Sequence, residues 1–234
     1  MWGLSRQKMR AIGHRGCRGP HQENSLQAIK WAFDNGAWAV EVDVWLIEGE
    51  LVLIHDRRAH AYTGATGFIK NIPLTKLREV MEVPTLADAL HAVPSNRGIN
   101  IEIKDPEAIE LCTSLVTRYV ELGYIRWDQI LFSSFDHRIL ADIKRVHHRA
   151  NIAPLFANIP LQICGYASRL DAVAINMDVD CLDLETVEQA HAYGLAVYVY
   201  TVNCAIDVDM LSSWGVDGIF CDDVSWYMGY RHDL

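Results

Sequence analysis

Short apolar runs rich in Val, Ile and Ala alternate with segments of helical periodicity along most of this 234-residue chain. Eight of these runs are expected to be strands, at 11–16, 39–46, 98–104, 129–135, 151–156, 172–178, 196–202 and 218–222. A strand–helix–strand repeat within one domain makes the strands parallel, with the helices as crossovers. Eight parallel strands are the number that closes an α/β TIM (β/α)8 barrel, although an open doubly wound sheet has the same alternating pattern.

The stretch after the second strand departs from this alternation. Residues 48–50, Glu-Gly-Glu, are expected to turn the chain into an extra strand at 51–55 that forms a hairpin with the second strand. A small insertion follows at about 57–97, with turns and two short helices, and either a lid over a site or a passive surface loop fits it. With this insertion, residues 1–234 are expected to form a single barrel domain.

The overall charge limits the class of partner. With 21 Lys and Arg against 30 Asp and Glu, the net charge of −9 argues against non-specific nucleic-acid binding, while a small anionic substrate is compatible with it. No apolar run approaches the length of a membrane span, and no apolar signal region follows the basic N-terminus, so we expect a cytoplasmic protein without stable membrane insertion. The six cysteines lack metal-ligand spacing and are expected to be buried, reduced thiols.

Four aromatic residues near the termini allow two interpretations. Trp2, Trp226, Tyr227 and Tyr230 could form an exposed apolar patch, and hence a homodimer contact. Packing of the same rings against the floor of the barrel is at least equally compatible with the sequence.

Acidic residues occur where strands are expected to end. Glu41 and Asp43 alternate with valines, so both side chains project from one face of the second strand, and Glu102 ends the third strand. Burying such acids is costly unless a positive charge meets them. The C-terminal ends of barrel strands meet at one rim, where three carboxylates would form an oxygen-ligand site for a hard divalent cation, Mg²⁺ or Ca²⁺.

Basic residues and histidines are expected at the same rim. His14 and His55 have ordinary pKa values near neutrality, which suits them to general acid and base work. Arg15 and Lys104 supply positive charge for an anion such as a phosphate ester. Taken singly, each has a structural alternative, such as an ion pair between Glu102 and Lys104 or a hydrogen-bonded core histidine at 55, but their convergence favours phosphate-ester chemistry.

The motifs that carry these residues resemble those of the glycerophosphodiester phosphodiesterases along nearly the full chain. Each motif alone is weak, and their order is specific. They are G-H-R-G at 13–16, E-N-S at 23–25, E-V-D at 41–43, H-D at 55–56, P-T-L at 84–86, I-E-I-K at 101–104, S-S-F at 133–135, T-V-N at 201–203 and G-V-D-G-I-F-C-D at 215–222.

The resemblance implies a TIM barrel that hydrolyses glycerophosphodiesters to sn-glycerol 3-phosphate and an alcohol, with a divalent metal. The roles it implies are metal binding for Glu41, Asp43 and Glu102, acid/base catalysis for His14 and His55, and phosphate binding for Arg15 and Lys104. The resemblance implies a supporting role for Glu23 beside the metal or the histidines. We expect Asn24 to have a structural role. Which histidine is the acid stays open, as does the nucleophile, a glycerol hydroxyl that gives a cyclic phosphate or a water molecule.

The sequence departs from the family at the pocket wall. Tyr200 stands where the family often has Trp, and Asp223-Val224 follows Asp222 in place of a proline. The preferred alcohol therefore does not follow from the resemblance. Two alternatives to the family's usual reaction are phospholipase-D-like action on lysophospholipids and a non-catalytic binding barrel. A non-catalytic barrel would be expected to have lost one or more of the ionic residues of the site, and none is lost.

Overall fold

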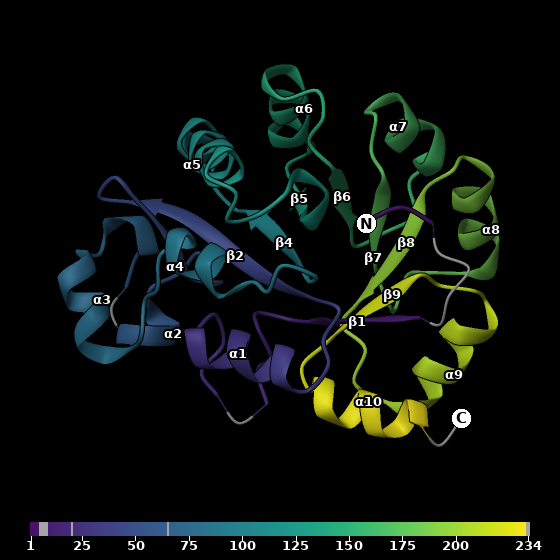
Figure 1. The fold of residues 1–234 in the computed structure, drawn as a ribbon, viewed down its shortest axis with the longest axis horizontal. Helices are drawn as coiled ribbons and strands as arrows, with labels where there is room; N and C mark the ends of the chain where they lie inside the picture. The colour runs from purple at the N-terminus through teal and green to yellow at the C-terminus, as the bar shows by residue number, and fades with distance from the viewer. Residues whose placement is uncertain (5–8, 20, 65, 233–234) are drawn as a thin grey trace.

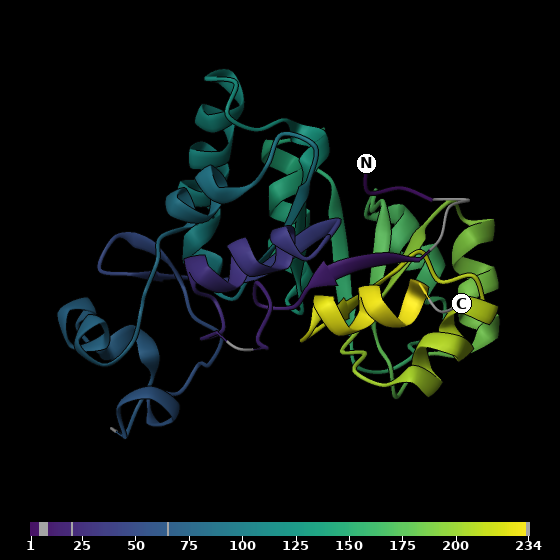
Figure 2. The ribbon, with the colours of Figure 1, turned by 60° about the horizontal axis from the view of Figure 1, so that its bottom comes forward.

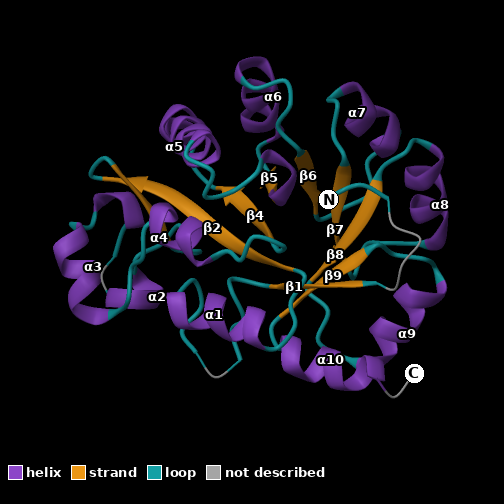
Figure 3. Cartoon of the chain, in the orientation of Figure 1, coloured by secondary structure: helices purple, strands orange, loops and turns teal. Residues whose placement is uncertain are grey.

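Eight parallel strands close into a barrel in the computed structural model, which describes residues 1–4, 9–19, 21–64 and 66–232 (Figures 1 and 3). The barrel strands are β1 (Arg10–Gly13), β2 (Ala39–Ile47), β4 (Gly98–Ile103), β5 (Ile130–Ser134), β6 (Ile152–Phe156), β7 (Ala174–Asp178), β8 (Ala196–Tyr200) and β9 (Gly218–Cys221). β1 pairs in parallel with both β2 and β9, so the ring is closed. This closure confirms the TIM barrel and excludes the open sheet.

Helices follow the strands and surround the barrel (Figure 1). They are α1 (Leu26–Asp34), α5 (Ile109–Glu121), α6 (His137–Val146), α7 (Ile163–Arg169), α8 (Leu184–Ala192), α9 (Ala205–Ser213) and α10 (Val224–His232), with short 3-10 turns η2 (Pro106–Ala108) and η3 (Trp127–Gln129) before α5 and β5. The sequence did not lead us to expect α10, which begins where the Asp223 carboxylate accepts a hydrogen bond from the Trp226 N–H. None of the described helices is long and apolar enough to cross a membrane.

The insertion begins with the expected hairpin. β3 (Glu50–Leu53) pairs antiparallel with the end of β2, and α2 (His60–Thr63), η1 (Ile69–Asn71), α3 (Leu74–Val80) and α4 (Leu86–Ala92) follow. Trp45 and Val52 of the hairpin pack with Ile69 and Leu77 in an apolar cluster separate from the main core. Because this cluster holds α2 and α3 to the hairpin, they project from one side of the barrel (Figure 2).

An aromatic residue from the N-terminus fills the floor of the barrel. Trp2 is 1% exposed and packs edge-on against Trp38 and Tyr198, with ring centroids 4.6 and 5.7 Å away. Tyr227 is also buried, and its hydroxyl donates to the Met9 carbonyl. Packing against the barrel therefore accounts for both residues and removes them from any surface patch, so the described chain gives no support to a dimer contact built on them.

Most of the thiols lie in the interior, as the composition suggested. Cys17, Cys112, Cys164 and Cys221 are buried, Cys181 is half-buried and Cys204 is exposed, and all six are free thiols. Burial raises the pKa of the Cys112 thiol to about 12. The four buried cysteines therefore act as small, mainly apolar side chains, whereas the exposure of Cys204 departs from the expected burial.

Replacing Trp2 with Ala is expected to lower the free energy of unfolding by about 3–5 kcal/mol, because it empties the barrel floor. Urea denaturation followed by circular dichroism measures this loss. Trp2→Phe should cost less, since the indole N–H of Trp2 has no hydrogen-bond partner within the described part of the chain. Leu4→Ala, at a residue that is 48% exposed, is the control; an equal loss in Leu4→Ala and Trp2→Ala would contradict the assignment.

Candidate active site

A tight glycine-flanked loop after β1 brings two functional side chains to the mouth of the barrel. A Cβ at Gly13 would lie 1.8 Å from the Gly16 carbonyl oxygen, and Gly16 has a φ of +87° against α1. Any side chain larger than hydrogen at Gly13 or Gly16 would therefore force the backbone of this loop to move. His14 and Arg15 lie between the two glycines, and the Arg15 N–H donates to the Glu41 carboxylate at 2.7 Å.

Three buried carboxylates face one another at this mouth. Glu41 and Asp43 project inward from β2, and Asp43 is the register partner of Glu102 on β4. A carboxylate oxygen from each of the three lies within 4.8 Å of the others, and their exposed fractions are 3%, 1% and 8%. The Oε1 atom of Glu41 is buried and has no hydrogen-bond partner among the described residues, so its lone pairs could ligate a cation. Glu41, Asp43 and Glu102 are called the acidic triad below.

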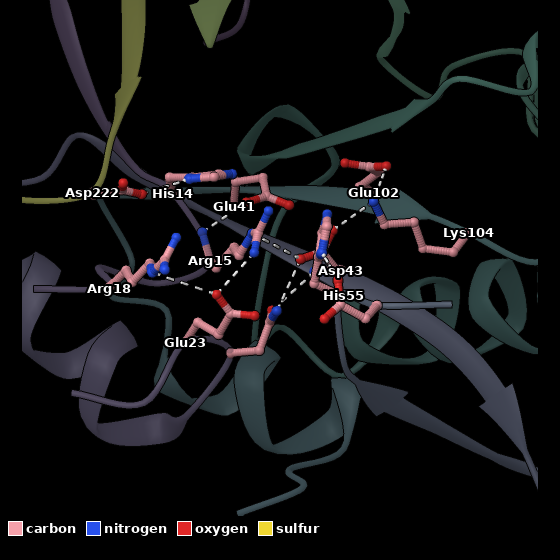
Figure 4. Close-up of polar contacts among 12 residues, drawn as sticks. His14, Arg15, Arg18, Glu23, Glu41, Asp43, His55, Glu102, Lys104 and Asp222 are labelled. Atoms are coloured by element: carbon pink, nitrogen blue, oxygen red, sulfur yellow. Dashed lines mark hydrogen bonds and ion pairs between the residues drawn. The ribbon is translucent and has the colours of Figure 1, made fainter. Parts of the chain in front are cut away.

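Two cations partly neutralise the acidic triad (Figure 4). The Lys104 ammonium lies 2.9 Å from Asp43 and also bonds to Glu102. The Arg15 guanidinium donates to Glu23 at 2.8 Å, and its Nε lies 3.8 Å from Asp43. Because Arg15 is shared with Glu23, these two positive side chains do not balance the three triad carboxylates, and the negative charge left over suits a divalent cation or a shared proton.

Asn24 holds the central acid of the triad. Its backbone has a φ of +56°, a left-handed conformation that Asn tolerates better than most residues. The Asn24 amide donates to the Asp43 carboxylate at 2.9 Å and accepts from the Asp43 N–H at 3.1 Å. The next residue, Ser25, caps α1. The E-N-S motif thus joins the start of α1 to β2, and the structural role expected for Asn24 is the positioning of Asp43.

The charges divide the triad into unlike acids. Burial, followed by the charges of Asp43 and Glu102, raises the pKa of Glu41 well above its ordinary value. Burial also disfavours ionised Asp43, but Lys104, His55 and Arg15 outweigh it and hold the pKa of Asp43 below its usual range. Burial also raises the pKa of Glu102, although Lys104 opposes it, so the rise is largest at Glu41, which is the first triad member to take up a proton when no cation is bound.

His14 is oriented by an acid from the far end of the chain. Its Nδ1 lies 2.8 Å from Asp222, directly after β9. Asp222 is held in turn by Asn203, which donates from its amide and accepts from the Asp222 N–H, both at 2.9 Å. With Nδ1 engaged, Nε2 is the ring nitrogen of His14 available to a molecule in the pocket.

His55 is oriented in a similar way by its neighbour in sequence. Its Nδ1 lies 2.8 Å from Asp56, whose backbone N–H donates to the Tyr62 hydroxyl at 3.1 Å. Tyr62 belongs to α2, so the insertion contacts the segment that carries this histidine. Burial, together with the charges of Lys104 and Arg15, lowers the pKa of His55 below its ordinary value.

These side chains surround a pocket of about 150 Å³ that has two unlike sides. His14, Arg15, His55 and the triad members Glu41 and Glu102 form an ionic side, with Lys104. The opposite wall is apolar and aromatic, and it consists of Phe135, Leu155, Tyr200 and Phe220. Such a pocket can hold an anionic group against its ionic side and carbon atoms against its wall.

All eight residues singled out from the sequence lie in or beside this pocket. Six line it directly, while Asp43 lies in the acidic triad and Glu23 bonds to Arg15. Sequence reasoning missed the roles of Asp56, Asn203 and Asp222. All three lie within the motifs H-D, T-V-N and G-V-D-G-I-F-C-D, so a search for acids at every expected strand end would have found Asp222.

A family model matches residues 14–225, which is most of the chain and contains every residue of the pocket. Its description is the glycerophosphoryl diester phosphodiesterase family. The chain belongs to this family. A glycerophosphodiester phosphodiesterase of Caldanaerobacter subterraneus subsp. tengcongensis is 28% identical over 232 residues, which cover 92% of this chain and 95% of the relative.

Solved structures of the family share the fold. A putative glycerophosphodiester phosphodiesterase from Galdieria sulphuraria superposes with a TM-score of 0.85 at 23% identity and covers 99% of this chain and 100% of its own. A phosphodiesterase from Oleispira antarctica, in complex with the product sn-glycerol-3-phosphate, gives 0.83 at 24% identity, with 96% and 97% covered. At these identities the likeness establishes the barrel architecture.

Replacing Asp222 with Asn is expected to lower kcat about 10- to 100-fold, because His14 loses the carboxylate that orients it. KM and the melting temperature should change little, since Asn203 can still bond to the backbone at 222. Steady-state kinetics and thermal unfolding measure these quantities. Asp128→Asn, at an exposed acid that pairs with Arg126, is the matched control, and wild-type kcat in Asp222→Asn would contradict the role.

The raised pKa of Glu41 predicts a pH-dependent response to cations. Without a cation, the Glu41 carboxyl keeps its proton in the folded protein, whereas in the unfolded chain it loses the proton at about pH 4. The folded protein therefore becomes less stable as the pH rises toward the pKa that Glu41 has in the folded state. A divalent cation replaces that proton, so its stabilising effect should grow with pH.

Thermal unfolding between about pH 5 and about pH 8, with and without Mg²⁺ or Ca²⁺, tests this response. Glu41→Gln should reduce both the pH slope and the stabilisation by cation, whereas Glu79→Gln, at an exposed site on α3, should leave both intact. An equal rise in melting temperature at both ends of the pH range would contradict the exchange of a proton for the cation.

Proposed function

We propose that this protein is a metal-dependent glycerophosphodiester phosphodiesterase that releases sn-glycerol 3-phosphate and an alcohol. One observation carries the proposal: two carboxylate-oriented imidazoles line the same pocket as an acidic triad and an arginine. Family membership and the product named for the Oleispira antarctica structure support the choice of glycerophosphodiesters over other phosphate esters.

The ionic side of the pocket is proposed to hold the phosphate. Glu41, Asp43 and Glu102 would ligate the metal, and an all-carboxylate set fits Mg²⁺ or Ca²⁺ better than zinc, which prefers nitrogen or sulfur. When bound, the metal supplies positive charge that offsets the charge developing on the phosphate oxygens. Arg15 contributes a fixed positive charge with planar donors, and Glu23 holds its guanidinium in place.

The Lys104 ammonium is proposed to act mainly through the triad. It bonds to Asp43 and Glu102, and these two acids raise its pKa against the opposing effect of burial. It therefore stays charged, favours the ionised form of Asp43 and opposes the rise that burial causes in the pKa of Glu102. Its place in the pocket lining also allows contact with a substrate oxygen.

The two histidines are proposed to exchange protons with the substrate. One imidazole removes a proton from the nucleophile, and the other donates a proton to the departing alkoxide. Asp222 and Asp56 engage Nδ1 of His14 and His55, respectively, so each Nε2 is left for this transfer. The nucleophile is either a glycerol hydroxyl, which forms a cyclic phosphate, or a water molecule. The choice between these two decides which histidine acts as the base and which as the acid.

An assay on defined diesters tests the function. Purified protein is expected to release glycerol 3-phosphate from glycerophosphocholine, glycerophosphoethanolamine or glycerophosphoglycerol, to lose activity with a chelator and to regain it with Mg²⁺ or Ca²⁺. Coupled detection of glycerol 3-phosphate measures turnover. Full activity in the presence of chelator, or none on any diester after metal is restored, would contradict the proposal.

The His14→Ala variant provides the control for contaminating hydrolases. It should retain the rise in melting temperature with cation and lose activity by about two to four orders of magnitude, because a general acid–base group contributes that much. His148→Ala, at an exposed histidine beyond α6, should match the wild type in both measurements. Near-normal turnover in His14→Ala would remove His14 from the mechanism.

A further inference from the structure

A buried asparagine lies deeper in the barrel than the acidic triad and beside one of its members. Asn100 on β4 is the register partner of Glu41 on β2, and the next inward pair toward the rim is Asp43 with Glu102. Residues two apart on a strand point to the same face, so Asn100 projects inward with Glu102. It is 1% exposed and lines the active-site pocket. Asn100 therefore forms part of the base of this pocket.

A neighbouring strand fixes the orientation of the Asn100 amide. Its Nδ2 donates to the Ser133 hydroxyl on β5 at 2.9 Å. The strand β4 lies between β5 and β2, and the two polar atoms of an amide diverge from one carbon. With the nitrogen directed to β5, the oxygen is left for the β2 side, where Glu41 lies. The Oδ1 atom of Asn100 is buried and has no hydrogen-bond partner among the described residues.

Two buried acceptor oxygens on adjacent strands therefore belong to the same pocket. They are Oε1 of Glu41 and Oδ1 of Asn100, and each lacks a hydrogen-bond partner in the part of the chain that the structure describes. With Glu41 ionised, neither oxygen can donate to the other, so the pair requires a cation or a donor of hydrogen bonds. A cation with a water ligand meets both needs, because the cation binds Glu41 and the water donates to Asn100.

The length of the side chain favours contact through water over direct coordination. Asn has one methylene fewer than Glu, so its oxygen reaches about 1.5 Å less far than a glutamate oxygen from a paired position. Asp43 and Glu102 also start two residues nearer the rim. The triad oxygens, which lie within 4.8 Å of one another, therefore meet nearer the rim than Oδ1 of Asn100. A water molecule is the group that joins these two levels.

We propose that Asn100 is a positioning residue of the cation site, whose Oδ1 accepts a hydrogen bond from a water ligand of the divalent cation, while Ser133 holds its amide in place. The inference rests on the proposed function and adds a residue outside the triad to it. Partners of this kind fix the ligands around a metal and raise its affinity. Mg²⁺ keeps several waters in a near-octahedral arrangement, whereas Ca²⁺ accepts a variable set of ligands. Loss of Asn100 should therefore weaken Mg²⁺ binding more than Ca²⁺ binding.

Calorimetric titration of the full-length protein with Mg²⁺ or Ca²⁺ alone tests the proposal without any turnover. Asn100→Leu removes the acceptor at similar side-chain volume. It is expected to weaken Mg²⁺ binding about 10- to 100-fold and Ca²⁺ binding by a smaller factor. Unchanged affinity for Mg²⁺ would overturn the proposal. An equal or larger loss of affinity for Ca²⁺ would also overturn it, because a direct ligand would give that result.

Three further variants separate this role from a general effect on the core. Asn100→Asp keeps an acceptor and should bind Mg²⁺ at least as tightly as the wild type. Ser133→Ala releases the amide and should weaken Mg²⁺ binding by a smaller factor than Asn100→Leu, and it carries the test if Asn100→Leu does not fold. Asn176→Leu is the matched control, since Asn176 on β7 is 0% exposed, its amide has no partner among the described residues, and it does not line the pocket. Equal losses of Mg²⁺ affinity in Asn176→Leu and Asn100→Leu would overturn the proposal.

Turnover distinguishes this role from a catalytic one. In Asn100→Leu, the Mg²⁺ concentration that gives half-maximal hydrolysis of glycerophosphocholine should rise by the same factor as the dissociation constant, and saturating Mg²⁺ should restore most of kcat. A kcat that stays low at saturating Mg²⁺ would overturn the proposal. Wild-type protein that binds Mg²⁺ but hydrolyses no diester would refute the proposed function and leave the affinity test of Asn100 in force. Chelator-sensitive hydrolysis, with Mg²⁺ affinity unchanged in Asn100→Leu, would refute only the role of Asn100.

Discussion

The burial of three carboxylates at the mouth of a closed barrel is the constraint on which the rest of this site depends. Such a cluster is stable only with compensating charge, and Lys104 and Arg15 supply two positive charges against the three acids of the triad. The shortage of positive charge is greatest at Glu41, whose pKa is raised by burial and whose Oε1 has no hydrogen-bond partner among the described residues. The glycine-flanked loop after β1 and the Asn24 amide both serve to hold this unfavourable cluster in one geometry.

Each catalytic candidate is placed by one element and oriented by another. His14 follows β1, and its orienting acid follows β9, so closure of the ring between β1 and β9 assembles the pair. His55 follows the hairpin strand, and Tyr62 of the insertion accepts a hydrogen bond from the backbone of Asp56. The insertion therefore supports the active site from outside the barrel, which favours a functional role over that of a passive loop.

The unlike sides of the pocket connect the reaction to substrate choice. Ionic groups gather on and just after β1, β2, β3 and β4, whereas the apolar wall comes from β5, β6, β8 and β9 and the residue that follows β5. A substrate with a phosphate at one end and carbon at the other has one favourable orientation in such a pocket. Tyr200, in place of the family's frequent Trp, belongs to the apolar wall, and its hydroxyl bonds to the Phe156 carbonyl. This departure affects the carbon side of the substrate and leaves the ionic side unaltered.

The sequence by itself predicted the eight barrel strands and the eight candidate residues that lie in or beside the pocket. Alternation with period two places Glu41 and Asp43 on one face, and the repeat of strands and helices predicts eight barrel strands, because both patterns are local. Only the tertiary structure decided which distant residues meet. The register of β4 on β2 sets Glu102 opposite Asp43, and ring closure brings Asp222 to His14 across 208 residues of chain. Neither contact has a local signal, since strand register and barrel closure depend on the packing of the whole ring.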